Sequence, residues 1–267
     1  MKILVCIKQV PNTNKVEVDP VTGVLKRSGI KGKMNPYDLF ALETSLQLKE
    51  KYGGQLTALT MGPGQAAETL QEALYMGADD AVLVSDRKLG GADVLATSYT
   101  LSQAIAACGT YDLIICGKQT TDGDTAQVGA EIAEWMGLPH AGNVIEVLQA
   151  DGEAVTVKLN QEHEIVTQRM PLPCLLCTDA DVNTPRLPSY KRKKEIGAGT
   201  IRTMTLADLK DTDPKHYGLA GSATQVERIF PPEKNDAKQM FTGTSAQLAD
   251  RLYALLTEHK FVEKGGR

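Results

Sequence analysis

The feature that most constrains the fold is a regular alternation of short apolar runs and longer segments with helical spacing in the first half of the chain. The runs are rich in β-branched residues, as in strands buried on both faces of a parallel sheet; they lie at 2–7, 55–61, 81–85 and 112–116. The helical segments lie at 37–51, 65–76, 92–107 and 124–136. This order predicts a doubly wound, mostly parallel α/β sheet with right-handed crossovers.

The rest of the chain adds three features to this sheet. Residues 16–27, "VEVDPVTGVLKR", have alternating arms around a turn and predict a β-hairpin insertion. After Pro139, strands are expected at 143–149, 154–159, 164–168 and 174–178. The tail "TSAQLADRLYALLTEHKF" predicts a helical arm in which Leu248, Leu252 and Leu255 form one stripe, and Thr244 and Gln247 have capping-box spacing. A chain of 267 residues is then divided into a nucleotide-binding domain, 1–230, and a C-terminal arm, 231–267.

Composition excludes several classes of function. The net charge is −4 and the pI about 5.7, so we expect no general attraction to nucleic acid or to an anionic membrane. No apolar run approaches the roughly 20 residues of a membrane span. The N-terminal "MKILVCIKQV" is typical of a strand and not of a signal peptide, so the expected compartment is the cytoplasm. Five cysteines without a disulfide framework indicate a reduced chain.

The stretch "GKQTTDGDTAQVGAE", 117–131, is the main functional candidate. It follows an apolar run, and ligands of open α/β sheets bind at the carboxyl ends of strands. With "CIK" at 6–8 and "MGPG" at 61–64 it would form a three-loop pocket for an adenine nucleotide. The residues alone leave a second interpretation, a polar loop followed by a capped helix. Asp122 and Asp124 either cap that helix or accept a ribose hydroxyl or a ring N–H.

Other motifs give weaker indications of function. The C-x-x-C of Cys174 and Cys177 fits a redox pair or half a zinc site, but a buried strand with the two residues on opposite faces is favoured. The run "KRKK" at 191–194 indicates a solvated basic turn or a docking surface for an acidic partner. The G-x-G-x-x-G and G-x-x-x-x-G-K-[ST] fingerprints are absent. No catalytic set is recognisable, so an enzyme of this kind would need a cofactor.

Several blocks in sequence order resemble the β (small) subunit of electron transfer flavoproteins. They are "VCIKQVP", "MNPYDLFALE", "TMGPGQAAETLQEALYMGAD", "DLIICGKQTTDGDTAQVGAE" and "TPRLPSYKRKK". The resemblance implies an α/β subunit of a heterodimer that buries an adenine nucleotide, while the α (large) subunit holds the flavin that serves partner dehydrogenases. A nucleotide-sensing domain of the universal-stress type is the hypothesis outside this family.

The resemblance also implies the site residues. The cofactor-binding set is Cys6, Asn35, Pro36, Tyr37, Asp38, Met61, Gly62, Thr120, Thr121, Asp122, Gly123, Asp124, Thr125, Ala126, Gln127, Val128 and Gly129. The pattern "TTDGDTAQVG" is similar to members that hold FAD, accept hydride from NADH and bifurcate electrons to ferredoxin and to the large-subunit FAD, which feeds an acyl-CoA dehydrogenase-type partner. The alternative is a subunit that binds AMP structurally.

Two partner surfaces follow from the same resemblance. A loop at about 183–194 is expected to dock the dehydrogenase through Pro185, Arg186, Leu187, Pro188 and Tyr190. Leu187 is the nearest candidate for the leucine that enters the partner in the family. The C-terminal arm is expected to pack on the large subunit through its leucine stripe.

Overall fold

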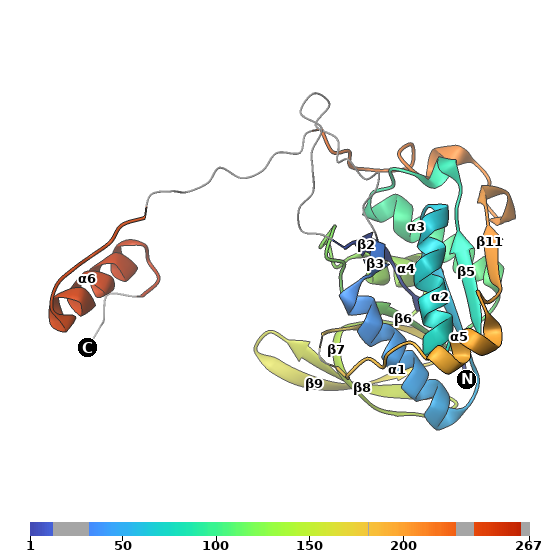
Figure 1. Cartoon of the computed structure of the whole chain (residues 1–267), viewed down its shortest axis with the longest axis horizontal. Helices are drawn as coiled ribbons and strands as arrows, with labels where there is room; N and C mark the ends of the chain where they lie inside the picture. The colour runs from blue at the N-terminus through green and yellow to red at the C-terminus, as the bar shows by residue number, and fades with distance from the viewer. Residues whose placement is uncertain (13–31, 181, 228–237, 263–267) are drawn as a thin grey trace. The chain divides into compact units, whose positions relative to one another are not determined.

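The computed structural model describes residues 1–12, 32–180, 182–227 and 238–262 (Figure 1). The chain divides into two compact units, Met1–Glu227 and Arg228–Arg267. The hairpin predicted at 16–27 lies outside the described residues. The segments on either side of it pair as antiparallel strands, β2 (Gln9–Pro11) and β3 (Gly32–Met34).

A nine-stranded sheet forms the centre of the first unit, in the order β11-β5-β4-β1-β6-β10-β7-β8-β9. Its first seven strands are parallel, and β8 and β9 continue it antiparallel, beyond β7 (Figure 1). The strands are β1 (Lys2–Cys6), β4 (Gln55–Met61), β5 (Asp80–Val84), β6 (Leu113–Gly117), β7 (His140–Ala150), β8 (Ala154–Gln161), β9 (Glu164–Pro171), β10 (Cys174–Thr178) and β11 (Ile201–Met204). The predicted mostly parallel α/β sheet is confirmed.

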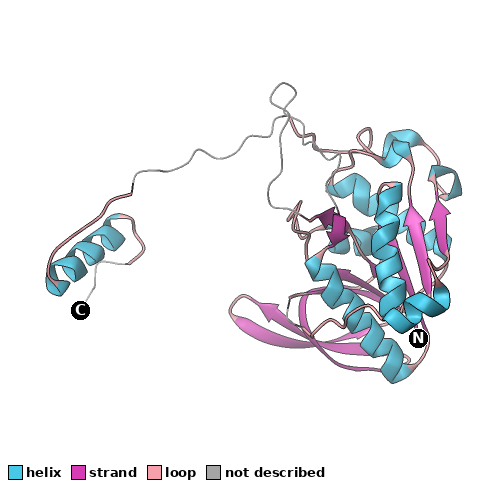
Figure 2. Ribbon diagram, viewed as in Figure 1, coloured by secondary structure: helices cyan, strands magenta, loops and turns pink. Residues whose placement is uncertain are grey.

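Helices cover both faces of this sheet (Figure 2). The α-helices of the first unit are α1 (Pro36–Tyr52), α2 (Ala67–Met76), α3 (Val94–Cys108), α4 (Val128–Met136) and α5 (Tyr190–Ile196). The 3₁₀-helices are η1 (Gly64–Ala66), η2 (Arg87–Leu89), η3 (Leu206–Asp208) and η4 (Pro214–His216). Successive side chains of a strand point to opposite faces. Ile3 and Val5 of β1 therefore join the core under α1 and α2, while Leu4 and Cys6 join the core under α3 and α4.

The structure corrects the predicted start of one helix. The segment expected to be helical from 124 begins its helix, α4, only at Val128. Asp124 and Ala126 have φ angles of 54° and 55°, in the left-handed region, and a right-handed helix cannot include such residues. The segment predicted at 65–76 is likewise divided, because its first turn is the 3₁₀-helix η1 and α2 follows it.

The second unit contains helix α6 (Ser245–Glu258). Its predicted capping box is confirmed: Gln247 N–H donates to Thr244 Oγ1, and Thr244 N–H donates to Gln247 Oε1 at 3.0 Å. Leu248 and Leu252 are exposed, and Leu255 is half-buried. Among the helices of the described residues, none has the length and apolar character needed to cross a membrane.

Candidate functional site: the loops around Lys8

The candidate site lies where the strand order reverses. The chain passes from β1 to β4 and β5 on one side, and then returns to place β6 on the other side of β1. In doubly wound sheets, ligands bind at the carboxyl ends of strands at this switch point. Cys6, the last residue of β1, is in register with Leu59 of β4 and Cys116 of β6. The loops that follow these three strands therefore begin side by side.

Asn35 joins the loop after β1 to the loop after β6. Its backbone N–H donates to the carbonyl oxygen of Lys8 at 2.9 Å. Its Nδ2 donates to the carbonyl oxygen of Gln119 at 2.8 Å, and its Oδ1 accepts from the N–H of Thr121 at 3.2 Å. The residue is completely buried, where unpaired polar groups are costly, and both ends of its amide are used. Asn35 thus precedes α1 but does not cap the helix with its side chain. Its backbone binds the loop after β1, and its side chain binds the loop after β6.

Asp38 makes a second connection between the same loops. Its Oδ2 accepts from the N–H of Lys8 at 2.7 Å. Burial raises the pKa of Asp38 to about 7, although hydrogen bonds from Asn35, Lys8 and Gly117 favour the ionised form. A Cβ at Gly117 would collide with the Asp38 carboxylate and with the Tyr37 backbone, so the close approach of β6 to α1 requires glycine. The first turn of α1 therefore holds the ends of β1 and β6 together.

Lys8 pairs with Asp122 across the switch point. Its Nζ lies 2.8 Å from both carboxylate oxygens. Partial burial works against ionisation, but the hydrogen bond and the charge of Lys8 hold the pKa of Asp122 below its usual value. This answers part of the question about the aspartates: the residue that precedes α4 is Gln127, and neither Asp122 nor Asp124 caps the helix. Their contact with a ribose or a ring remains a prediction.

The loop between β6 and α4 is built as an exposed turn. The N–H of Asp124 donates to the carbonyl oxygen of Thr120 at 2.9 Å, and the N–H of Gly123 donates to Thr120 Oγ1 at 3.3 Å. Gln119 Nε2 donates to Asp124 Oδ1 and lies 3.4 Å from the hydroxyl of Tyr37. Residues 121–127 are exposed. Ala126 has a left-handed conformation that alanine rarely adopts, and such outliers are concentrated at functional sites.

The "MGPG" loop completes the arrangement. The N–H of Ile7 donates to the carbonyl oxygen of Leu59 at 2.9 Å, and Gln9 Nε2 donates to the carbonyl oxygen of Gln65 at 3.2 Å. Met61 and Gly62 are half-buried. Gly64 is exposed, with no atom near the position that a Cβ would take. The structure thus brings together all the loops that the sequence assigned to one pocket.

Two of the predicted cofactor-binding residues face the sheet. Gly129 is buried, and a Cβ there would collide with Cys177 Sγ. Val128 packs against the apolar core under α3 and α4. Both residues anchor the start of α4, and direct contact with a ligand remains a prediction for them.

The buried cysteines lie in strands of the central sheet. Cys6, Cys116 and Cys177 lie in register on β1, β6 and β10, all in the core under α3 and α4. The neighbouring Cys6 and burial raise the pKa of Cys116 well above its usual value, and burial does the same for Cys177. Cys174 belongs to the core on the other face, so the buried-strand interpretation of the C-x-x-C is confirmed.

Two residues of this site, Lys8 and Gln119, lie in the predicted loops 6–8 and 117–131 but were not among the individual cofactor-binding residues expected from the sequence. Lys8 connects the loops through its backbone and its ammonium group, and Gln119 connects Asn35, Tyr37 and Asp124. The signal for Lys8 was its place directly after the apolar run 2–7. The contacts of Gln119 carried no signal in the sequence, because only the folded chain brings it near α1.

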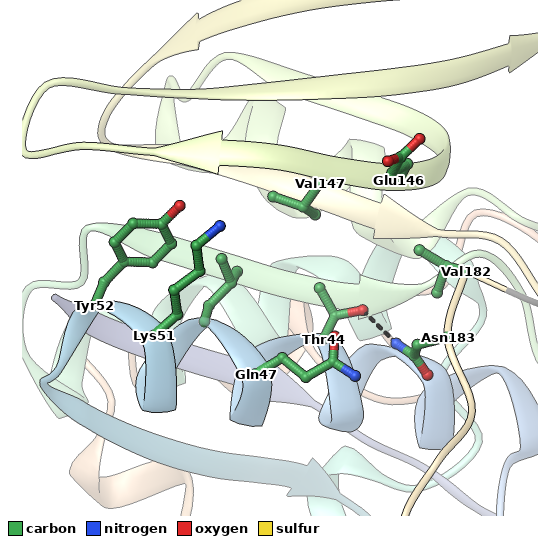
Figure 3. A pocket seen from close by; sticks show the side chains of 9 residues that line it. Thr44, Gln47, Lys51, Tyr52, Glu146, Val147, Val182 and Asn183 are labelled. Carbon is green, nitrogen blue, oxygen red and sulfur yellow. Dashed lines mark hydrogen bonds between the residues drawn. The ribbon is translucent and has the colours of Figure 1, made fainter.

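A separate cavity of about 210 Å³ lies between α1 and β7 (Figure 3). Thr44, Gln47, Lys51 and Tyr52 of α1 line it together with Glu146 and Val147 of β7, and residues Val182 and Asn183 close one side. The loops at the carboxyl ends of β1, β4 and β6 do not contribute to it. The cavity is therefore distinct from the candidate site.

Comparison with known proteins identifies the family. A model of the electron transfer flavoprotein domain matches residues 22–209. The chain belongs to the electron transfer flavoprotein family. It is 40% identical over 269 residues to the electron transfer flavoprotein subunit beta of Thermoanaerobacterium thermosaccharolyticum, covering 98% of this chain and all of that protein. It is 42% identical over 243 residues to the subunit beta of Megasphaera elsdenii, covering 88% of this chain and 89% of that protein.

A third relative is named as a subunit of a complex. The caffeyl-CoA reductase-Etf complex subunit CarD of Acetobacterium woodii is 40% identical over 265 residues, covering 98% of this chain and 100% of the relative. These matches place the chain among the β, or small, subunits of electron transfer flavoproteins. An electron transfer flavoprotein β subunit has an α subunit as its partner.

Proposed function

We propose that this β subunit binds FAD at the loops around Lys8 and takes part in electron bifurcation. In the proposed activity NADH delivers a hydride, one electron passes to ferredoxin, and the other passes to the large-subunit FAD, which feeds an acyl-CoA dehydrogenase-type partner. The two electrons of the hydride are thus divided between two acceptors. The observation that carries the proposal is the convergence of the loops after β1, β4 and β6 and the start of α1 at the switch point.

The residues present fit a flavin adenine dinucleotide. Asn35, Asp38 and Lys8 hold the loops in place, and the exposed turn 120–127 and the open position at Gly64 leave backbone available to a ligand. Gly123, with no side chain, leaves room beside Thr125 for a longer nucleotide. Bound FAD would supply acceptance of two electrons and their release one at a time. The name of the relative that belongs to a caffeyl-CoA reductase complex supports a CoA-ester dehydrogenase as partner.

Lys8 and Asp122 have a specific place in this proposal. Their pairing neutralises the negative charge that would otherwise repel a phosphate from the loop. A nucleotide phosphate can then approach the Lys8 side of the pair, while the Asp122 carboxylate remains an acceptor for a ribose hydroxyl or a ring N–H. We propose further that Leu187 and Tyr190 dock the dehydrogenase and that α6 packs on the large subunit.

The composition of the purified heterodimer tests the cofactor. We expect two FAD molecules per heterodimer after extraction of the bound nucleotides and separation by chromatography. One FAD together with one AMP would show instead that the subunit binds AMP structurally, and it would end the bifurcation proposal. Reduction of the purified complex by NADH, with ferredoxin and the dehydrogenase as acceptors, then tests the proposed division of electrons.

Substitutions in the loop test the location of the site. Asp122→Ala and Thr125→Ala are expected to lower flavin content and NADH oxidation, because both side chains lie on the turn that would cover the ligand. Glu134→Ala removes a carboxylate from the exposed surface of α4 and is the matched control. Full retention of both flavins in the two loop variants would contradict the assignment.

A further inference from the structure

The segment 183–192 is fastened to the fold at both of its ends. At the first end, Asn183 Nδ2 donates to the carbonyl oxygen of Phe40 at 3.0 Å and to Thr44 Oγ1 at 2.8 Å, as the dashed line in Figure 3 shows for Thr44. At the other end, Arg192 Nε donates to the carbonyl oxygen of Leu74 at 3.0 Å and its Nη2 to that of Ala78 at 3.1 Å. The segment therefore lies against both α1 and α2.

Between these ends, Arg186 is clamped by two carboxylates of α1. Its backbone N–H and its Nε donate to Glu43 Oε2 at 3.1 and 2.8 Å, and its Nη2 donates to Glu43 Oε1 at 2.9 Å. Its Nη1 and Nη2 also donate to the Glu50 carboxylate. Glu43 and Glu50 are about two helical turns apart, so they lie on one face of α1 and hold the planar guanidinium between them.

This clamp differs from an ordinary surface ion pair. The side chain of Glu43 is only 5% exposed, whereas exposed pairs contribute little because water screens them. Burial would raise the pKa of Glu43, but the hydrogen bonds from Arg186 and Gln47 hold it below its usual value. The carboxylate of Glu43 therefore remains charged inside the fold because Arg186 is there.

Two large side chains project from the fastened segment. Leu187, next to the clamped residue, is 87% exposed, and Tyr190 is 71% exposed. An apolar side chain exposed on a rigid loop is typical of a residue that enters a partner's pocket. Lys191, Lys193 and Lys194 follow on α5, so a complementary pocket would have acidic groups at its rim.

We propose that Arg186 is a positioning residue for partner docking: its clamp on Glu43 and Glu50 holds the neighbouring Leu187 in the conformation that an apolar, acid-rimmed pocket of the partner dehydrogenase receives. This rests on the proposed docking function of the same segment. A loop that is already ordered loses less freedom when it binds, so its apparent affinity is higher. Arg186 acts through Leu187 and not by its own contact with the partner.

The test uses the whole heterodimer and the acyl-CoA dehydrogenase that the wild-type complex reduces. Arg186→Met is expected to raise the KM for the dehydrogenase about tenfold. This is the rise expected if only about one-tenth of the variant molecules hold the docking conformation, because the apparent affinity falls in proportion to that fraction. The kcat at saturating dehydrogenase and the flavin content are expected to remain those of the wild type. Arg169→Met, which removes an exposed arginine from β9, is the matched control and should leave KM unchanged.

A double substitution separates positioning from direct contact. Leu187→Ala removes the anchor, so adding Arg186→Met to it should raise KM by less than about twofold, because coupled residues are not additive. The double variant Arg186→Met/Glu43→Gln removes the buried charge of Glu43 together with the arginine that pairs with it. If Arg186→Met alone does not fold, this double variant takes its place in the KM measurement. Hydrogen exchange gives a readout that does not need the dehydrogenase: the amides of residues 186 and 189, which donate to Glu43 and to the carbonyl oxygen of Tyr75, should exchange at least about tenfold faster without Arg186.

Three outcomes would overturn the inference. The first is a KM for Arg186→Met equal to that of the wild type while Leu187→Ala raises it. The second is a pair of effects that multiply in the double variant, since Arg186 would then act independently of Leu187. The third is an unchanged KM for Leu187→Ala, which would show that the docking surface itself is wrong, whereas the nucleotide content of the heterodimer would still decide the cofactor.

Discussion

At the scale of single residues, the candidate site depends on buried polar groups and on close approaches that only glycine allows. Asn35 and Asp38 are buried and bind the loops after β1 and β6. Gly117 and Gly129 bring a strand and a helix to distances that a side chain would prevent. The change in stability that a substitution causes at one of these positions should therefore depend on the residue that the position contacts.

Gly129→Ala should destabilise the protein by about 1–3 kcal/mol, because the new methyl group overpacks against Cys177. Cys177→Ala removes the sulfur that causes the collision. The double variant should therefore be more stable than the sum of the two single effects predicts, by about 1 kcal/mol or more. Urea unfolding of the four proteins measures this coupling, and strict additivity would contradict the assigned contact.

Asp38 should make stability depend on pH. The folded-state pKa of about 7 lies above the ordinary value of 3.8. Between these values the folded state binds more protons than the unfolded state, so the contribution of Asp38 is fully present below about pH 4 and is lost as pH rises through 7. The loss is at most about 1.4 kcal/mol per pH unit.

Asp38→Asn removes this titration, while all other groups remain. We expect the free energy of unfolding of the wild type, relative to this variant, to fall between about pH 4 and 7, the interval between the two pKa values. Denaturant unfolding across this range is the measurement. Parallel pH curves for the two proteins would show that Asp38 does not have the raised pKa.

At the scale of secondary-structure elements, α1 has two tasks. Its N-terminal turn, with Asn35 and Asp38, holds the loops of the candidate site. Its later turns carry Glu43 and Glu50, which bind Arg186 of the segment 183–192. Helix α6 has a different character, because its capping box supports it locally while its leucine stripe remains exposed or half-buried.

A charge placed on the leucine stripe of α6 should weaken assembly of the heterodimer. Leu252 is 57% exposed, and Leu252→Asp places a charge on the stripe proposed to pack on the large subunit. The dissociation constant should rise by about 100-fold or more, about 3 kcal/mol. Ala254→Asp adds the same charge on the opposite side of the helix, because two residues turn a helix by about 200°.

Analytical ultracentrifugation of the wild type and the two variants measures this difference. The Ala254→Asp complex should dissociate as the wild type does. Equal weakening by both substitutions would show that the added charge, and not the stripe, is responsible.

At the scale of the whole molecule, the order of strands decides where ligands can bind. The reversal at β1 brings together loops from residues 7–9, 35–38, 61–65 and 118–127, which are far apart in the sequence. A ligand at this point would connect segments that lie between residues 7 and 127 of the first unit. It would bind the folded chain and not the unfolded one.

Nucleotide binding should therefore raise the unfolding temperature of the full chain. At about 100 times its dissociation constant, FAD should stabilise the fold by about 2.7 kcal/mol, or roughly 5–10 °C for a unit of this size. FMN lacks the adenine half and should give a smaller shift. Asn35→Ala should lose the response to FAD, since the loops are no longer joined. An equal response to FMN and FAD in a thermal melt would contradict an adenine-nucleotide site.

The sequence by itself determined the fold class and most of the elements. Apolar runs of strand length between segments of helical period can bury their surfaces only as a sheet covered by helices, so 55–61 and 112–116 were predictable as strands. The capping box at Thr244 was predictable for a similar reason, because it is made within one turn. The loops of the candidate site were predictable as a group, since they follow strands whose carboxyl ends meet.

Only the tertiary structure decided the roles of the individual side chains in that site. The start of α4 at Val128, the pairing of Asp122 with Lys8, and the clamp of Arg186 on Glu43 and Glu50 join residues that no local pattern relates. A charged or polar side chain in a loop has several partners within reach, and local spacing does not choose among them. The choice follows from which strands are neighbours, because neighbouring strands fix which loops meet and therefore which charges must be paired.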